Sequence, residues 1–341
     1  MSAKFTGGRN LTGDPLEGVH PVLVSHLTPL RPWLYDERKS RDVSEICING
    51  AGDVWIEKGH GNWERLQMKQ LDGLWAKALL GNLANALRID FDPETSPKIR
   101  ASLPGGHRLA GLVGAACESE FVISIRRRHR AVRRFEDFGI GEEMQGRLAA
   151  LMESGGTIMI SGPAYAGKTT LLNLIAGLIP KTRRVATIED SREVFIDHPN
   201  QINLLVDRFS ETPRFGYLHA LDSINSLRID TVICQELSQE NAAAALRLMN
   251  MGQAGFLITG HADSALDMLD AWRTNIEMGR ANKLSGNIVK MLARRLDAIL
   301  HLGFGQRDDG TTGRILSETI LKNRSSDQHG QYYLDCAWEQ L

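Results

Sequence analysis

Residues 162–169, with the sequence GPAYAGKT, constrain this chain more than any other segment. They fit the phosphate-loop pattern GxxxxGK[ST] at every fixed position, and they lie between an apolar strand-like run and an apolar helical run. Glycines let backbone N–H groups converge on phosphate oxygens, and the helix N-terminus adds partial positive charge. The pattern predicts a nucleotide site in which Lys168 reaches the β- and γ-phosphates and the Thr169 hydroxyl binds Mg²⁺. The expected nucleotide contacts from this segment are Gly162, Pro163, Ala164, Tyr165, Ala166, Gly167, Lys168, Thr169 and Thr170.

The second half of the chain alternates near-continuous apolar runs with helical stretches. The runs fall at residues 157–161, 184–189, 202–206, 230–234 and 255–259. Such a pattern is typical of a parallel sheet that is covered on both faces. We therefore expect an α/β fold whose C-terminal part is a RecA-like P-loop NTPase domain with a mostly parallel sheet. The tail from about residue 305 indicates exposed turns in a closing hairpin.

The first half of the chain has shorter elements with Gly-rich turns between them, which predict an antiparallel sheet. A short amphipathic helix is expected from Leu23 to Leu34, and residues 70–88 predict a longer one. That longer helix places on one stripe Leu71, Leu74, Trp75, Ala78, Leu79 and Ala86. Strands are expected at 43–48, 53–57, 63–68, 98–102, 107–113 and 120–125. This half is therefore an N-terminal α+β domain.

Composition limits the class of protein and the place where it works. Because 40 basic residues almost balance 41 acidic ones, the chain has no overall positive charge for gripping a nucleic acid. The four cysteines lie far apart and form no CxxC pair, which argues against a structural zinc site and favours a reducing compartment. We find neither a secretory signal nor an apolar run long enough to span a membrane. A cytoplasmic protein is the expectation, unless a partner carries it to a membrane.

The division of the chain follows from these shifts in pattern. We expect a flexible leader at 1–17, the N-terminal domain at 18–128, a linker at 129–141 and the ATPase domain at 142–341. An arginine-rich run at 126–134 lies at the first boundary. Three interpretations remain open for it: a solvated face between domains, a subunit-interface or phosphate contact, or a site for anionic lipid or nucleic acid. Only one aromatic residue, Phe135, directly follows this run, which argues against base stacking on a single strand.

Three polar groups follow the expected buried strands, where the ligand crevice of a parallel sheet lies. Glu236 comes after 230–234 and is a candidate general base for water, although a solvated glutamate is the alternative. Glu189 and Asp190 end the strand at 184–189, and an ordinary cap or turn is their alternative role. His261 follows 255–259 and is otherwise a structural histidine.

These segments, in this order, resemble one known family. GPAYAGKTT, TIEDSREV, TVICQEL and NMGQAGFLITGHADSA look like the Walker A, acidic box, Walker B and His box of the secretion ATPases. VSEICINGAGDVWIE, ASLPGGHRLAGLV and FVISIR are similar to the N-terminal domain of the type IV secretion and conjugation branch, the VirB-eleven class. The resemblance covers about residues 20–305. It implies a homohexameric ATPase that works with ATP and Mg²⁺ at the inner face of the bacterial inner membrane.

The same resemblance implies roles for individual residues. Lys168, Glu236, Glu189 and His261 would be catalytic, with Thr169, Glu189 and Glu236 near the metal and His261 sensing the nucleotide. Arg108 and Arg126 match N-domain arginines that reach the phosphates; a turn salt bridge and a solvated charge run are their alternatives. The implied partners are the chain itself, inner-membrane and cytoplasmic components of a type IV secretion system, and a DNA or protein substrate, with peripheral membrane contact.

Several positions depart from the family's pattern. Arginines are expected where this chain has Asp222, Ser226 and Ser238, and a small residue where it has Gln235. Gly260 and Asp263 replace commoner His-box residues. Fewer cations near the phosphates should weaken transition-state stabilisation. Two further hypotheses therefore stand beside a type IV secretion motor: a nucleotide-gated assembly scaffold with little hydrolysis, and a pilus or type II secretion motor.

Overall fold

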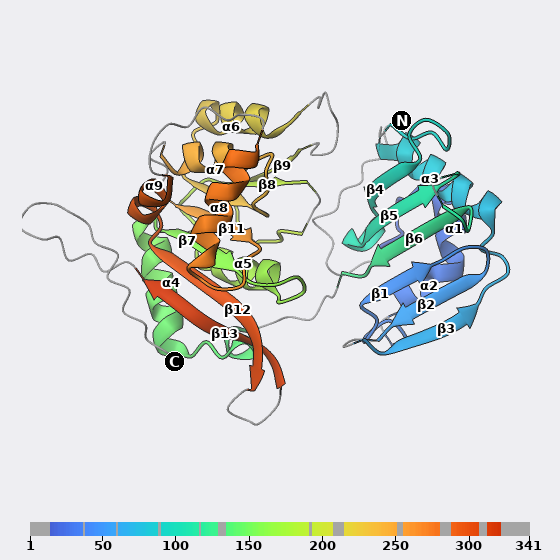
Figure 1. Ribbon diagram of the computed structural model, residues 1–341, viewed down its shortest axis with the longest axis horizontal. Coiled ribbons are helices and arrows are strands. Elements are labelled where there is room, and N and C mark those ends of the chain that lie inside the picture. Colours follow the sequence, from blue (N-terminus) through green and yellow to red (C-terminus); the bar gives the residue numbers. More distant parts are fainter. Residues whose placement is uncertain are drawn as a thin grey trace, which may run out of the picture. The chain divides into compact units, whose positions relative to one another are not determined.

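The chain divides into two units, Met1–Ala131 and Val132–Leu341. The computed structural model describes residues 14–36, 38–58, 61–87, 90–115, 117–128, 134–190, 193–206, 215–250, 255–279, 288–306 and 312–321. Most of the expected leader and of the arginine-rich run, and the end of the tail, lie outside these residues. Each unit has its own sheet and its own core (Figure 1).

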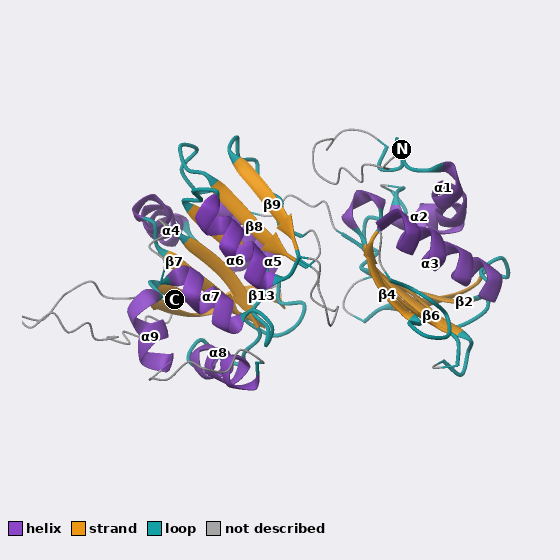
Figure 2. Cartoon of the chain, turned by 90° about the horizontal axis from the view of Figure 1, so that it is seen from above, coloured by secondary structure: helices purple, strands orange, loops and turns teal. Residues whose placement is uncertain are grey.

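The first unit is a six-stranded antiparallel sheet with helices on one face (Figure 2). The strand order is β3-β2-β1-β6-β5-β4. The strands are β1 (Glu45–Ile48), β2 (Asp53–Glu57), β3 (Trp63–Gln67), β4 (Lys98–Ser102), β5 (Arg108–Val113) and β6 (Phe121–Arg126). The helices are α1 (Pro21–Leu27), α2 (Arg31–Leu34) and α3 (Gly73–Leu87), with short 3₁₀ turns at η1 (Thr28–Leu30) and η2 (Pro104–Gly106). The predicted antiparallel α+β domain is confirmed.

Helix α3 buries only part of the stripe that its sequence indicates: Leu79 is buried, and Trp75 and Ala78 are partly buried. Its buried residues are Ala76, Leu79, Leu80, Leu83 and Ala84, whereas Leu74 is 80% exposed and Ala86 is also exposed. The helix starts at Gly73, so Leu74 lies in its first turn, about 120° around the helix axis from Leu80. Leu80 packs over β5, where a methyl group on Gly111 would lie 2.8 Å from it. The prediction was wrong for Leu74 and Ala86, because apolar residues surround most of this helix and tertiary packing selects the buried face.

The second unit is a seven-stranded sheet that is parallel except for its last strand. The strand order is β13-β12-β7-β11-β10-β8-β9, and only the β12–β13 pair is antiparallel. The strands are β7 (Thr157–Ser161), β8 (Val185–Glu189), β9 (Gln201–Leu205), β10 (Thr231–Cys234), β11 (Phe256–Gly260), β12 (Ala298–Gln306) and β13 (Thr312–Leu321). The five predicted parallel strands are confirmed to within one residue, and β12 and β13 form the predicted hairpin.

Helices cover both faces of this sheet, as continuous apolar strands require. They are α4 (Glu142–Ser154), α5 (Lys168–Ala176), α6 (Tyr217–Ser226), α7 (Ala242–Met249), α8 (Asp267–Met278) and α9 (Ile288–Arg295), with a 3₁₀ turn, η3 (Phe135–Phe138). One core layer lies under η3, α4 and α5, and the other under α6 to α9. The mostly parallel sheet brings the carboxyl ends of β7, β8, β10 and β11 to one edge. No helix among the described residues is long and apolar enough to cross a membrane.

Candidate nucleotide site

The phosphate loop connects the end of β7 at Ser161 to the start of α5 at Lys168. Two of its residues need to be glycine. Gly162 has φ +146°, and a methyl group there would lie 2.5 Å from the Leu302 carbonyl oxygen. Gly167 has φ +93°, in the left-handed region that residues with a Cβ avoid. The loop therefore has the tight turn and close strand contact that the sequence motif predicts.

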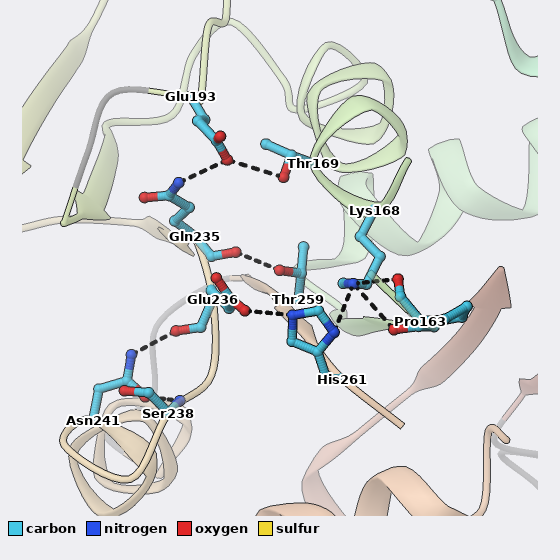
Figure 3. Close-up of polar contacts among 11 residues, drawn as sticks. Pro163, Lys168, Thr169, Glu193, Gln235, Glu236, Ser238, Asn241, Thr259 and His261 are labelled. Atoms are coloured by element: carbon cyan, nitrogen blue, oxygen red, sulfur yellow. Dashed lines mark hydrogen bonds and ion pairs between the residues drawn. The ribbon is translucent and has the colours of Figure 1, made fainter. Parts of the chain in front are cut away.

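Lys168 lies inside this loop rather than in solvent, with 8% of its surface exposed. Its Nζ donates hydrogen bonds to the carbonyl oxygens of Gly162, at 3.0 Å, and Pro163, at 2.8 Å. It also lies 3.2 Å from Nδ1 of His261, which follows β11 (Figure 3). The lysine that the motif assigns to the phosphates is thus held by the loop and by the next strand end.

His261 connects the loop to the acidic residue after β10. Its Nε2 lies 2.7 Å from Glu236 Oε1, while Nδ1 faces Lys168 (Figure 3). Both side chains are partly exposed, at 52% for His261 and 33% for Glu236. The expected meeting of Lys168, Glu236 and His261 at one edge of the sheet is therefore present. A chain of three groups that can hold a proton or charge runs from the phosphate loop to a carboxylate.

Backbone contacts fix the turn that carries Glu236. The Glu236 carbonyl accepts a hydrogen bond from Asn241 Nδ2 at 2.7 Å, and Asn241 Oδ1 accepts one from the Ser238 N–H at 2.8 Å. The Gln235 carbonyl accepts one from the Thr259 hydroxyl at 2.5 Å. Ser238 is buried within this turn. The position where the family resemblance predicts an arginine therefore contributes to the turn and supplies no cation.

Glu189, at the end of β8, is buried and accepts hydrogen bonds through both carboxyl oxygens. It is 98% buried, since only 2% of its surface is exposed. Its Oε1 accepts a hydrogen bond from the Thr187 hydroxyl at 2.9 Å. Its Oε2 accepts hydrogen bonds from the backbone N–H groups of Glu193 and Val194, at 2.7 and 2.8 Å. These contacts hold the segment after β8 against the strand end, and Asp190 beside it is partly exposed.

Glu193 is the carboxylate that faces Thr169, and the sequence analysis did not select it. Its Oε2 accepts a hydrogen bond from the Thr169 hydroxyl at 3.3 Å and one from Gln235 Nε2 at 2.9 Å (Figure 3). Its carbonyl accepts a hydrogen bond from Asn173 Nδ2 on α5. The only available signal was its membership of the acidic segment EDSRE, because the loop path that brings it to α5 is a tertiary feature.

The residues around Thr169 suit a magnesium ion. A threonine hydroxyl and a carboxylate oxygen are hard oxygen donors of the kind that Mg²⁺ prefers. Gln235 lies beside them and is 3% exposed. Its Nε2 must be the atom that faces Glu193, since a carboxylate accepts and does not donate. Among the described residues, the buried Gln235 Oε1 has no hydrogen-bond partner, so a further acceptor lies beside Glu193 and Thr169.

Arg108 and Arg126 lie in the first unit, at one end of two adjacent strands. They are directly opposite each other in the antiparallel pairing of β5 with β6. Arg126 also lies opposite Glu45 of β1. Arg108 is partly buried and Arg126 is exposed. The structure therefore brings the two predicted arginines together as a cross-strand pair.

Strand β7, the glycine loop, α5 and the acidic strand ends together define a P-loop nucleotide-binding domain. The family model for type II/IV secretion system proteins matches residues 39–302, so the chain belongs to that family. This confirms the predicted resemblance.

Curated relatives place the chain near the type IV branch. It is 30% identical over 272 residues to the type IV secretion system protein PtlH of Bordetella pertussis, covering 70% of this chain and 77% of that one. It is 27% identical over 327 residues to the type IV secretion system protein VirB11 of Brucella suis, covering 86% and 88%. Among solved structures, the Legionella pneumophila ATPase DotB matches with a TM-score of 0.62 at 14% identity, over 88% of this chain and 81% of that one. The last similarity shows a shared fold.

Proposed function

We propose that this chain is an ATP hydrolase of a type IV secretion or conjugation machine. The observation that carries the proposal is the contact chain from Lys168 through His261 to Glu236, with steps of 3.2 and 2.7 Å. It joins a phosphate loop to a carboxylate at the edge of the sheet where a γ-phosphate would lie. Membership of the secretion system family, with relatives named as type IV secretion system proteins, supports the choice of machine.

Each residue at this edge has a defined task in the proposed reaction. Lys168 neutralises charge on the β- and γ-phosphates, and Glu236 accepts the proton of the water that attacks the γ-phosphorus as the bond to ADP breaks. His261 holds the Glu236 carboxylate and responds to any movement of Lys168. Thr169 and Glu193 would hold Mg²⁺, directly or through its waters. When bound, the ion neutralises charge on the phosphate oxygens.

At the level of the assembly, we propose a homohexamer at the inner face of the bacterial inner membrane. Its partners would be inner-membrane and cytoplasmic components of the secretion system, and its cargo a DNA or a protein. We keep the prediction that Arg108 and Arg126 contact the nucleotide phosphates. They are directly opposite each other on β5 and β6, and a pair of neighbouring arginines suits an anion.

A second candidate, a nucleotide-gated scaffold with little hydrolysis, rests on a specific observation. Ser238 is buried in the turn after Glu236, where the family resemblance predicts a cation, and Asp222 and Ser226 lie on α6 where it predicts arginines. A site with fewer cations stabilises the transition state less. Such a chain would bind ATP and assemble without rapid turnover.

Steady-state phosphate release by purified protein separates the two candidates, with oligomer mass recorded in the same samples. We expect wild-type hexamers to hydrolyse ATP and Lys168→Ala to lose ATP binding. Glu236→Gln should still bind ATP but release phosphate at least about 100-fold more slowly, because its amide cannot accept the proton.

The matched control is Glu240→Gln, which removes the same charge four residues along the chain at an exposed position. Its turnover should equal that of wild type. Hexamers that bind ATP yet release no more phosphate than Glu236→Gln would support the scaffold. Unchanged ATP binding and turnover in Lys168→Ala would contradict both candidates.

A further inference from the structure

The β12–β13 hairpin lies on the opposite side of β7 from the acidic groups. In the strand order, β12 neighbours β7 on one side, while β11, β10 and β8 follow on the other (Figure 1). Glu236 and Glu193 therefore lie on the β11 side of β7 and of the phosphate loop that follows it. If the γ-phosphate faces Glu236, a nucleoside end that points away from Glu236 along the strand order lies toward the hairpin. The hairpin is the part of the described sheet on that side.

Side chains on one face of this hairpin continue from the core to solvent beside the loop. Leu302 and Leu316 are directly opposite each other, and Leu302 is fully buried in the layer that contains Ala166 of the loop. The next pair on the same face is Phe304 and Arg314, because successive side chains on a strand alternate between faces. Phe304 is 56% exposed. An exposed aromatic ring is thus the next side chain along this face after the buried Leu302, which packs in the same layer as the phosphate loop.

Arg314 lies against the phosphate loop itself. A methyl group on Gly167 would be 3.2 Å from Arg314 Cδ and 3.1 Å from Phe138 Cε1 of η3. The guanidinium group begins one bond beyond Cδ, so it lies within a few bond lengths of Gly167. Arg314 is half-buried. It lies about 150 residues after the phosphate-loop motif in the sequence. No motif in the sequence indicates it.

We propose that Phe304 and Arg314 form the subsite for the nucleoside end of the nucleotide, with the base stacking on Phe304 and the α-phosphate meeting Arg314. This inference rests on the proposed nucleotide binding and extends it to the base. A purine is a large planar π-system that gains free energy on an aromatic face. An arginine at a phosphate adds charge-assisted hydrogen bonds. Arg314 would thereby supply, in the same unit as the loop, a cation that Asp222, Ser226 and Ser238 do not supply.

The central test measures the Kd of two ligands, ADP and inorganic tripolyphosphate, each with Mg²⁺. Phe304→Ala should weaken ADP binding about tenfold, within the range of base–aromatic stacking, and leave tripolyphosphate binding unchanged because that ligand has no base. Arg314→Met keeps the apolar stem and removes the charge. It should weaken both ligands, and the difference from wild type should shrink as salt is raised.

Two matched controls lie on the same unit. Leu218→Ala removes an apolar side chain that is 63% exposed on α6, and Arg295→Met removes an exposed arginine from α9. Neither should change either Kd. Phe304→Trp keeps an aromatic face and should retain ADP affinity. Its added indole fluorescence should be changed by ADP and unaffected by tripolyphosphate, a readout that remains if the alanine variant folds poorly.

The outcomes distinguish this inference from the function on which it rests. Wild-type protein that binds ADP, with Phe304→Ala and Phe304→Trp showing no base-specific effect, would overturn the subsite and leave nucleotide binding intact. Equal losses of ADP and tripolyphosphate in Phe304→Ala would also overturn it, as would hexamer loss in that variant with unchanged Kd values, which would assign Phe304 to a subunit contact. A wild-type protein that binds neither ligand would overturn both proposals.

Discussion

At the residue scale, two glutamates four positions apart in the chain take different places. Glu189 is buried, and its carboxyl oxygens accept hydrogen bonds from one hydroxyl and two backbone N–H groups. Glu193 faces the Thr169 hydroxyl and the Gln235 amide. We therefore propose that the first glutamate shapes the loop and that the second faces the phosphate site.

Exchanging each carboxylate for an amide should separate these roles. Glu189→Gln places an NH₂ group near backbone donors, and we expect it to lower the free energy of unfolding by about 2–3 kcal/mol. Glu193→Gln should leave stability nearly unchanged and raise the Mg²⁺ concentration needed for half-maximal ATP binding, because a neutral amide oxygen attracts the ion less. Urea unfolding and Mg²⁺ titrations of nucleotide binding measure the two effects. The reverse pattern would show that Glu189 holds the ion.

At the element scale, a side-chain hydrogen bond adds to the backbone pairing of the strand before the phosphate loop with the strand beside it. The Ser161 hydroxyl, at the end of β7, lies 2.9 Å from Nδ1 of His301 on β12. Burial is the main cause that lowers the pKa of His301, and Lys168 lowers it further. The nearby carboxylates of Glu318, Asp263 and Asp267 act in the opposite direction. His301 is therefore neutral in the folded protein near pH 7.

This arrangement predicts a loss of stability in acid. Folding lowers the pKa of His301, so this histidine binds a proton more readily in the unfolded chain, where its pKa is about 6.5. Its favourable contribution is fully present above that value and is lost as pH falls toward the folded pKa. We expect the free energy of unfolding to fall more steeply between pH 7 and pH 5 in wild type than in His301→Gln. Urea unfolding across that range measures the slope.

The control for this measurement is His20→Gln, which removes an exposed histidine from the first unit. In this variant, the free energy of unfolding of the second unit should depend on pH as steeply as in wild type. Parallel slopes in wild type and His301→Gln would contradict the assignment of a buried neutral histidine beside the loop.

At the scale of the whole molecule, the two units have separate hydrophobic cores. The core of the first unit contains Leu80 of α3, and one layer of the second contains Trp272 of α8, both fully buried. The phosphate loop and all the groups described around it belong to the second unit. A ligand that binds there stabilises the folded form of that unit by mass action.

We therefore expect two unfolding transitions in scanning calorimetry. ADP and Mg²⁺ should raise the midpoint temperature of the transition that belongs to the second unit. Leu80→Ala should lower the midpoint temperature of the first unit's transition, since removal of a buried leucine side chain costs about 2–5 kcal/mol of unfolding free energy. Leu74→Ala, on the same helix but 80% exposed, is the matched control and should change neither. A single transition that shifts as a whole with ligand would show that the two cores unfold together.

Much of this protein follows from local patterns that need no knowledge of packing. The glycine and lysine spacing of the loop sets its turn, and the apolar runs set the strands of the parallel sheet. Their order along the chain also indicated the family. Because parallel strands end at one edge, the meeting of Lys168, Glu236 and His261 was predictable from their positions after strands.

Tertiary structure alone decided which side chains complete the site. Glu193 reaches Thr169 through the path of a loop, and Arg314 reaches Gly167 because β13 pairs with β12 at the edge of the sheet. The buried stripe of α3 was likewise set by the sheet beneath it. In each case the deciding contact joins segments distant in the chain or lies in a loop of irregular shape. Local periodicity carries no information about such contacts, because they depend on which surfaces the packed core leaves available.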